Sequence, residues 1–204
     1  MAIKTPHEYK EMEYIGILLE LARLLKPKTY VEIGVKKAFT FNQMTGIIPE
    51  CYGIDIDASC ASRISYRKAE DVKRIHFHHG GSKTFASYAT ECAVPLIDFL
   101  FIDGDHKWES VLKDLLALLP FVTPTTGLIF LHDTYPVCPE LATSGYCSDA
   151  WRAARLIRLY YADRVEIVTL PGPWAGLSIL RKVLRGQHLH WKGPEILEGS
   201  EENK

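Results

Sequence analysis

The chain has 204 residues, of which 47% are hydrophobic and 24% charged, and this length and composition suit one folded domain with a sizeable core. The formal net charge of -1 gives no overall reason to expect a nucleic acid or another polyanion as a partner. No apolar run reaches the roughly 18 residues of a membrane-spanning helix, so no membrane partner is expected either.

The five cysteines are odd in number and lack the short paired spacing of a zinc site. No signal-like segment stands at the amino terminus, and we therefore expect these cysteines to be reduced thiols. The sequence predicts a cytoplasmic protein.

The chain opens with a predicted amphipathic helix over residues 8–25, whose apolar side chains recur at helical spacing until Pro27. We expect residues 1–27 to form a helical cap. From residue 29 onwards, strand-like and helix-like segments alternate. The strands are predicted at 29–34, 52–57, 74–78, 96–102 and 128–131, and the helices at 37–45, 58–70, 82–90 and 107–119. This order predicts an α/β fold with a Rossmann-like, doubly wound sheet and right-handed crossovers.

The alternation loosens after residue 132. Residues 132–149 form a predicted loop that contains proline, glycine and cysteine. Such a loop is long enough to act as a lid, because connections beyond about 12 residues in a compact domain are often functional. A helix is predicted at 150–161, followed by strands at 165–170 and 177–183. Residues 186–204 are polar and poorly patterned, and we expect them to fray, which leaves 1–185 as a single domain.

Four of the apolar runs end abruptly in an acidic residue or a glycine: TYVEIG, YGIDID, FLFIDGDH and GLIFLHD. Such runs fit strands that are buried on both faces of a parallel sheet. The carboxyl ends of parallel strands meet at one edge, where ligands bind in open α/β sheets. We therefore place the functional site at that edge.

The first strand-to-helix turn holds four candidate ligand contacts: Glu32, Gly34, Ala38 and Thr40. A glycine there lets the backbone approach a ligand, and a carboxylate can accept hydrogen bonds from an ammonium group. The alternative is that the glycine merely makes the turn. The dinucleotide fingerprint G-x-G-x-x-G would need glycines where Lys36 and Phe39 stand, so pyrophosphate binding is disfavoured.

Asp55 ends the second apolar run, 23 positions after Glu32, where an acidic side chain can bind both hydroxyls of a ribose. The alternative is a solvated turn carboxylate or a helix cap, a role for which Asp57 and Ser59 are equally suited. Ser82 follows two glycines at the end of the third run and is a candidate contact for an adenine edge. A turn with a helix N-cap explains Ser82 as well.

Three histidines precede these glycines with H-x-H-H spacing: His76, His78 and His79. This spacing suggests a metal site. Alternate residues of a strand point to opposite faces, however, so a shared metal ion is disfavoured here.

Four sequence motifs resemble those of the class I S-adenosylmethionine-dependent methyltransferases: VEIGVKKAFT, YGIDID, FLFIDGDHKWESVLKDL and GLIFLHDT. More narrowly, they resemble the branch with a strand that ends IDGDH and a later strand that ends HD. The resemblance covers residues 29–134. It implies a seven-stranded, mostly parallel sheet with an antiparallel last strand, which 177–183 would supply. It also implies S-adenosyl-L-methionine as cofactor, with Glu32 and Gly34 at the methionine portion, Asp55 at the ribose and Ser82 near the adenine. The implied cofactor contacts are Glu32, Gly34, Ala38, Thr40, Asp55, Ser82 and Asp103. Ala38 departs from the glycine of many relatives.

The same edge is similar to the metal site of catechol-type and sugar-type O-methyltransferases. In that site an aspartate after the fourth strand and an acidic or amide pair after the fifth bind a divalent cation. Asp103 matches the first position, and His132 with Asp133 falls on the pair. Oxygen ligands suit Mg²⁺, whereas the imidazole of His132 shifts the preference towards manganese, iron or zinc. The sequence leaves open whether a metal such as Mg²⁺ or Mn²⁺ is required.

His106 lies three residues after Asp103, where several metal-dependent relatives carry a catalytic lysine. An imidazole with an ordinary pKa of ~6.5 suits the removal of a proton from a methyl acceptor. His132 is the competing base, and helix capping by Asp105 and His106 is the alternative role. Four aromatic residues are candidates for the acceptor pocket or for ordinary packing: Tyr135, Tyr146, Trp151 and Trp174.

The sequence thus predicts a methyltransferase that acts on the hydroxyl of a small molecule, such as a saccharide, a phenol or a secondary metabolite. N-methylation is the less favoured reaction. A nicotinamide-dependent oxidoreductase and a non-catalytic nucleotide-binding module are the alternatives, and the absent glycine fingerprint argues against the first. The sequence does not name the acceptor, and it leaves the oligomeric state open, a homo-oligomer included.

Overall fold

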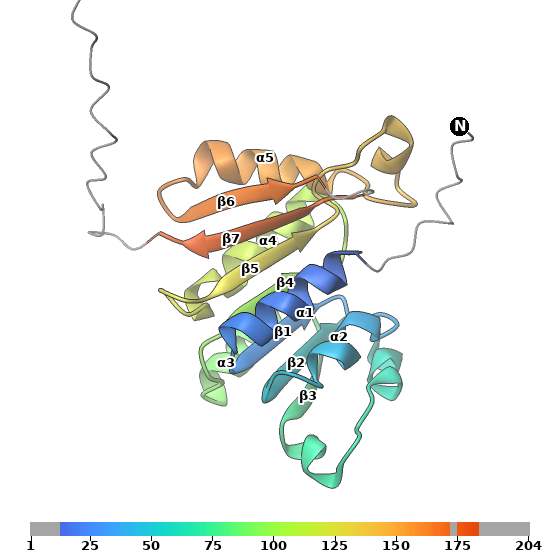
Figure 1. The fold of residues 1–204 in the computed structure, drawn as a ribbon, viewed down its shortest axis with the longest axis vertical. Helices are drawn as coiled ribbons and strands as arrows, with labels where there is room; N and C mark the ends of the chain where they lie inside the picture. The colour runs from blue at the N-terminus through green and yellow to red at the C-terminus, as the bar shows by residue number, and fades with distance from the viewer. Residues whose placement is uncertain (1–12, 172–174, 184–204) are drawn as a thin grey trace, which may run out of the picture.

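In the computed structural model, which describes residues 13–171 and 175–183, seven strands form one sheet in the order β3-β2-β1-β4-β5-β7-β6 (Figure 1). The strands are β1 (Thr29–Ile33), β2 (Glu50–Asp55), β3 (Ile75–His79), β4 (Phe99–Ile102), β5 (Leu128–His132), β6 (Val165–Leu170) and β7 (Leu177–Lys182). Strands β1 to β5 pair in parallel, and β7 lies antiparallel between β5 and β6. The predicted doubly wound sheet with an antiparallel last strand is therefore confirmed.

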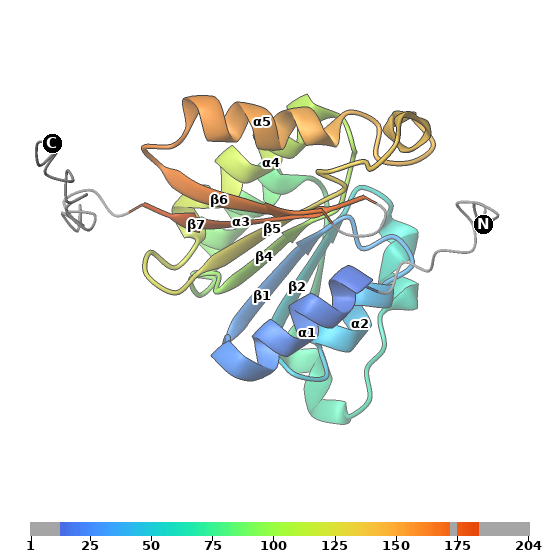
Figure 2. The ribbon, with the colours of Figure 1, turned by 45° about the horizontal axis from the view of Figure 1, so that its top comes forward.

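The helices divide between the two faces of the sheet, as Figure 2 shows. They are α1 (Glu13–Leu25), α2 (Phe39–Met44), α3 (Ser82–Glu91), α4 (Trp108–Leu118) and α5 (Ala150–Tyr160). Leu18, Ala22, Phe41 and Met44 of α1 and α2 belong to one core cluster, whereas the buried apolar side chains that the other cluster takes from helices come from α3, α4 and α5. None of the helices in the described ranges combines the length and the apolar character that crossing a bilayer requires.

Strand β4 is covered by helices on both faces, and this explains why its sequence is apolar throughout. Phe99 and Phe101 pack into the core beneath α1 and α2, whereas Leu100 and Ile102 pack into the core beneath α3, α4 and α5. Because successive strand residues point to opposite faces, a strand covered on both sides needs apolar residues at every position. All four are at most 2% exposed.

One predicted helix is wrong. Residues 58–70 form two short 3₁₀ segments at their ends, Ala58–Arg63 and Ala69–Lys73, instead of one α-helix. Local side-chain hydrogen bonds explain the difference, because such bonds give the backbone an alternative to a helix. Asp57 accepts from the N–H of Ser59, and the Asp71 carboxylate accepts from the N–H groups of Arg67 and Lys68.

Several predictions fall partly or wholly outside the described residues. The first described residue of the opening helix is Glu13, so residues 8–12 of the predicted helix are not covered. Trp174 and the predicted tail at 186–204 also lie outside the described residues. That the chain forms a single domain over 1–185 stays a prediction.

The connection over 132–149 packs against the start of α4. The carbonyl oxygen of Tyr146 lies 2.7 Å from Nδ1 of His106, and the carboxylate of Asp149 accepts from the N–H of Trp108 at 3.0 Å. The connection also contains a short 3₁₀ turn, Pro139–Ala142. It therefore reaches the edge of the sheet where the sequence predicts the site, and its role as a lid stays a prediction.

Candidate active site

The register of the sheet brings four strand ends to one level. Ile33 pairs with both Ile54 and Ile102, and Ile102 pairs with Leu131. The residues that follow these four positions are Gly34, Asp55, Asp103 and His132. Four of the predicted site residues thus stand side by side at the carboxyl edge, because the side-by-side pairing of parallel strands fixes their relative height.

Gly34 occupies a turn that excludes a side chain. Its φ is +90°, and an added Cβ would overlap the carbonyl of Asp103 and lie 2.6 Å from Cα of Gly104. Its N–H donates to the carbonyl of Ile54 at 2.9 Å. The first turn is therefore pressed against the end of β4, and only glycine permits this approach.

Ala38 also adopts the left-handed conformation, with φ at 56°, at the start of α2. This conformation favours glycine, which agrees with the glycine expected at this position from the resemblance. Thr40 follows in the first turn of α2 and is 5% exposed. Its hydroxyl lies 3.2 Å from the hydroxyl of Tyr14 on α1.

Glu32 is buried beneath the turn. It is 2% exposed, and its Oε2 accepts from the Tyr30 hydroxyl at 2.5 Å. Burial raises the pKa of the Glu32 carboxyl well above its usual value, although the hydrogen bond from Tyr30 lowers it. A buried carboxylate is costly unless it is paired, and a cation beside Glu32 would offset that cost.

Asp55 closes the turn from the neighbouring strand. Its Oδ2 accepts from the N–H of Lys36 and its Oδ1 from the N–H of Asp57, both at 2.9 Å. The first contact joins the end of β2 to the turn after β1. The carboxylate thus stands at the end of β2 with two backbone N–H groups as its partners.

Ser82 is directed towards α4. It is 4% exposed, and its hydroxyl donates to Oδ1 of Asp114 at 2.6 Å. The structure therefore gives the Ser82 hydroxyl a protein partner on α4.

Asp105 accepts from the hydroxyl of Ser110 at 2.8 Å and from the N–H of Lys107 at 3.3 Å, so the capping role considered for Asp105 has its geometric partners.

Asp103, His106, His132 and Asp133 form a cluster at the ends of β4 and β5, called the Asp–His cluster below. Oδ1 of Asp103 lies 2.9 Å from Nδ1 of His132 and 3.3 Å from Nε2 of His106. Asp133 contacts both rings, through Oδ2 at 2.9 Å from Nδ1 of His106 and Oδ1 at 3.3 Å from Nδ1 of His132. Each imidazole thus faces both carboxylates.

The charges in the Asp–His cluster shift the pKa values of its members. Burial disfavours the charged form of His106, but hydrogen bonds to Asp103 and Asp133 outweigh it and raise the pKa of His106 to about 11. The pKa of His132 is also raised: burial lowers it, but the charge of Asp103 and the hydrogen bond to it outweigh that effect. Burial would raise the pKa of Asp103, but the two histidines hold it well below its usual value. The two carboxylates thus favour the charged form of both imidazoles.

The two histidines differ in the use of their ring nitrogens. Both nitrogens of His106 have partners, since Nε2 faces Asp103 while Nδ1 faces Asp133 and the carbonyl of Tyr146. His132 uses Nδ1, and within the described residues no hydrogen bond reaches its Nε2. The sequence singled out both histidines but gave no means of telling them apart.

Tyr14 is a residue that sequence reasoning missed. Its ring centroid lies 4.2 Å from that of His132 and 5.6 Å from that of Phe101, while its hydroxyl reaches Thr40. The helix α1 thus places one aromatic side chain between the first turn and the Asp–His cluster. The only signal in the sequence was the apolar stripe of the helix, which any packed helix shows.

The three histidines of β3 do not gather around this site. His76 pairs with Glu50, His78 with Thr84 and His79 with the carbonyl of Ile56, so these three histidines serve separate contacts. Tyr135 and Tyr146 are 49% and 40% exposed. In the part of the chain that the structure describes, the converging metal-type donors come from Asp103, His106 and His132.

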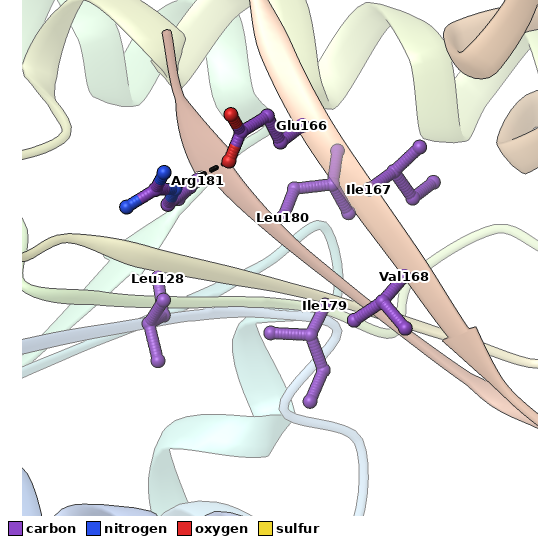
Figure 3. Close-up of a pocket in the computed structure, with 7 residues that line it drawn as sticks. All are labelled: Leu128, Glu166, Ile167, Val168, Ile179, Leu180 and Arg181. Carbon is purple, nitrogen blue, oxygen red and sulfur yellow. Dashed lines mark hydrogen bonds and ion pairs between the residues drawn. The ribbon is translucent and has the colours of Figure 1, made fainter. Parts of the chain in front are cut away.

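A separate hollow of about 410 Å³ lies over β5, β6 and β7 (Figure 3). It is lined by Leu128, Glu166, Ile167, Val168, Ile179, Leu180 and Arg181. Apart from the Glu166–Arg181 ion pair, its walls are aliphatic. None of the candidate residues lines it, so it is not the predicted site.

Residues 31–134 match the sequence model of a family described as a methyltransferase domain. No curated protein is significantly similar to the chain. An O-methyltransferase from Bacillus cereus, solved in complex with SAH, is 15% identical with a TM-score of 0.65, over 88% of this chain and 84% of that one. The O-methyltransferase TomG from Streptomyces achromogenes, in complex with SAM, is 16% identical with a TM-score of 0.61, over 90% and 82%.

A third solved structure, precorrin 8w decarboxylase from Methanobacterium thermoautotrophicum, is 15% identical with a TM-score of 0.55, over 89% of this chain and 96% of that one. Identities at this level show a shared fold. Because proteins named for different reactions share it, the fold alone does not decide the chemistry, and the residues at the carboxyl edge must do so.

Proposed function

Because the chain belongs to the methyltransferase domain family that its residues 31–134 match, we propose that it transfers the methyl group of S-adenosyl-L-methionine to a hydroxyl oxygen of a small molecule. The resemblance drawn from the IDGDH and HD motifs is confirmed at the level of the family and the fold. Family membership also argues against the nicotinamide-dependent alternative. The observation that carries the proposal is the meeting of Gly34, Asp55 and the Asp–His cluster at one edge of the sheet.

The residues of the first turn fit the cofactor. Gly34 lets the first turn pack against the end of β4, and Ala38 adds only a methyl group at a position with positive φ. Asp55 offers carboxylate oxygens at the level of the turn, which suits the two hydroxyls of a ribose. When bound, the cofactor supplies a methyl group that the positive charge on sulfur has activated. The task of the protein is then to hold the acceptor oxygen in line and to remove its proton.

His132 is the base that the geometry favours in the absence of a metal. Its Nε2 has no protein partner among the described residues, while Asp103 binds its Nδ1 at 2.9 Å and fixes the ring. The proton of the acceptor would pass to Nε2. His106 is less suited, because both of its nitrogens have partners among the described residues.

A divalent cation is a second route to the same result, because a bound cation lowers the pKa of the acceptor hydroxyl itself. The sequence predicted Asp103, His132 and Asp133 as ligands for Mg²⁺ or Mn²⁺. Asp103 and His132 are indeed among the donors that converge, and His106 joins them. The Asp–His cluster therefore fits a cation as well as a base.

Small hydroxylated acceptors remain the proposed substrates, and a nucleic acid remains disfavoured, since the net charge is only -1. The test is to incubate the purified protein with methyl-labelled S-adenosyl-L-methionine and separate pools of phenols, saccharides and amines. We expect labelled product from a hydroxylated pool. Product from the amine pool alone would contradict O-methylation. Binding of S-adenosylhomocysteine without product from any pool would favour the non-catalytic alternative.

A further inference from the structure

The Asp–His cluster has the form of a metal site with a different ligand set from the one the sequence predicts. We propose that Asp103, His106 and His132 bind a first-row transition-metal ion such as Zn²⁺, Fe²⁺ or Co²⁺, and that Asp133 orients a histidine ligand instead of binding the ion. The catalytic role of this ion rests on the proposed function, whereas its binding rests on the geometry alone.

Two of the three donor pairs stand close to the spacing that such an ion requires, and the third lies within 4.8 Å. One ligand atom from each of Asp103, His106 and His132 lies within 4.8 Å of the other two. Oδ1 of Asp103 lies 2.9 Å from Nδ1 of His132 and 3.3 Å from Nε2 of His106. Bonds of about 2.1 Å to nitrogen and oxygen place neighbouring ligands roughly 3.0–3.4 Å apart in octahedral or tetrahedral geometry. Small side-chain movements would therefore admit the ion.

Asp133 stands where the orienting group of a metal-bound histidine stands. Its Oδ2 lies 2.9 Å from Nδ1 of His106, and the carbonyl of Tyr146 lies 2.7 Å from the same nitrogen. Two acceptors at Nδ1 keep a proton there, so the lone pair of a neutral ring is on Nε2, which faces Asp103. A carboxylate that holds the outer nitrogen of a histidine ligand is a common feature of metal sites.

The second histidine is held by packing. The ring of His132 lies against Tyr14 at 4.2 Å between centroids and meets the edge of Phe101 at 6.0 Å. Asp133, the next residue, has φ at 59°, a left-handed conformation that favours glycine and that aspartate adopts more readily than most other residues. Such backbone strain clusters at functional sites, where the surrounding structure maintains it. Here it turns the Asp133 carboxylate towards both rings.

The donor set indicates the kind of metal. Mg²⁺ prefers oxygen ligands in near-ideal octahedral geometry, whereas imidazole nitrogen suits zinc, iron and other transition metals. Two imidazoles and one carboxylate leave at least one position free, as in catalytic sites that bind water or substrate. That position would receive the acceptor hydroxyl in the proposed reaction.

The test is direct binding of metal to the untagged, full-length protein after chelator treatment. Zn²⁺ is followed by calorimetry, Co²⁺ by its visible absorption, and Mg²⁺ is tested as a competitor. We expect one Zn²⁺ per chain, at least 100-fold weaker binding in His106→Asn or His132→Asn, and no competition by Mg²⁺. In Asp133→Asn, loss of the orienting group should weaken binding by about 10–100-fold.

The matched control is His76→Asn, which removes an imidazole that also lies 2.9 Å from a carboxylate oxygen, that of Glu50, but that belongs to no converging group in the described residues. Its Zn²⁺ affinity should equal that of the wild type. If a variant does not fold, nitrogen NMR of the histidine rings in the wild type gives the same test. Zn²⁺ should shift the ring-nitrogen signals of His106 and His132 and leave those of His76 unchanged.

Failure to bind Zn²⁺, equal losses in His76→Asn and His106→Asn, or full displacement of Zn²⁺ by Mg²⁺ would overturn this site. Binding of S-adenosylhomocysteine, measured on the metal-free protein, keeps the two proposals apart. If that ligand binds while Zn²⁺ does not, only the metal site is wrong. If Zn²⁺ binds while that ligand does not, the metal site stands and the proposed methyl transfer is wrong.

Discussion

The two halves of the carboxyl edge are built differently. At the ends of β1 and β2, Asp55 binds backbone N–H groups, and the chain itself shapes the turn around Gly34. At the ends of β4 and β5, side chains face side chains, and the Asp–His cluster depends on two strands and the loop around Tyr146. Backbone partners are fixed by the fold, whereas charged side chains can exchange one partner for another. We therefore propose that the first half binds the cofactor and that the second half carries out the chemistry.

The largest expected effect is that of Gly34→Ala, because Gly34 is where the two halves touch. A Cβ there overlaps the Asp103 carbonyl, and φ is +90°. We expect a loss of about 3 kcal/mol or more in the free energy of unfolding, since both strain and backbone displacement are involved. Urea unfolding measures it. Gly81→Ala is the control, because nothing lies within 4 Å of its added Cβ, and an equal loss there would contradict the account.

The next effect concerns the cluster half. Asp103→Asn removes a carboxylate charge shared by two imidazoles, so we expect a loss of roughly 2–4 kcal/mol in unfolding free energy at neutral pH. The comparison is Glu166→Gln, which breaks an exposed ion pair with Arg181. Such a pair contributes about 1 kcal/mol or less. Equal losses in the two variants would mean that the cluster is no more than a surface ion pair.

The pH dependence of stability separates the cluster from ordinary surface charge. The folded pKa of His106 is about 11, above an unfolded value of ~6.5, so its contribution is complete below about pH 6.5 and is lost as the pH rises towards 11. The pKa of Asp103 is lowered, so its contribution is present above about pH 4 and is lost at lower pH.

The difference in unfolding free energy between the wild type and His106→Asn should therefore be greatest between about pH 4 and 6.5 and should shrink at alkaline pH. Denaturant unfolding of metal-free samples across this range measures it. A difference that grows with pH would show that the cluster does not hold His106 as a cation.

The sequence predicted the first half of the edge well, because its determinants are local. Apolar runs that end in Glu32-Ile33-Gly34 and in Asp55 mark both the strands and the turns between them. The departure from glycine at Ala38 was also visible in the sequence, and the positive φ of this residue explains why glycine is favoured there. The helix that was wrongly predicted at 58–70 has a local cause too, since Asp57 and Asp71 bind nearby backbone N–H groups.

The second half was predicted as a set of residues but not as an arrangement. Asp103, His106, His132 and Asp133 were all singled out, yet which nitrogen faces which oxygen depends on how β4, β5 and the Tyr146 loop pack. The contact of Tyr14 with His132 depends likewise on where α1 crosses the sheet. Such contacts join residues far apart in sequence, and no local pattern records them.

The smallest expected effect is that of Tyr14→Phe, which removes the hydroxyl near Thr40 and keeps the ring against His132. We expect a loss of about 0.5–1.5 kcal/mol in unfolding free energy, the usual value for one hydrogen bond. Tyr14→Leu also removes the aromatic contact with His132 and should lower turnover more than Tyr14→Phe does. If both variants lower turnover equally, the ring does not position His132.

The most direct test of the account is calorimetry with S-adenosylhomocysteine on the wild type, Asp55→Ala and His132→Asn. We expect the wild type to bind, Asp55→Ala to bind about 1–3 kcal/mol more weakly because two ribose hydrogen bonds go unmade, and His132→Asn to bind almost as well as the wild type. A wild type that does not bind, or a loss confined to His132→Asn, would contradict the division of the edge into a cofactor half and a chemical half.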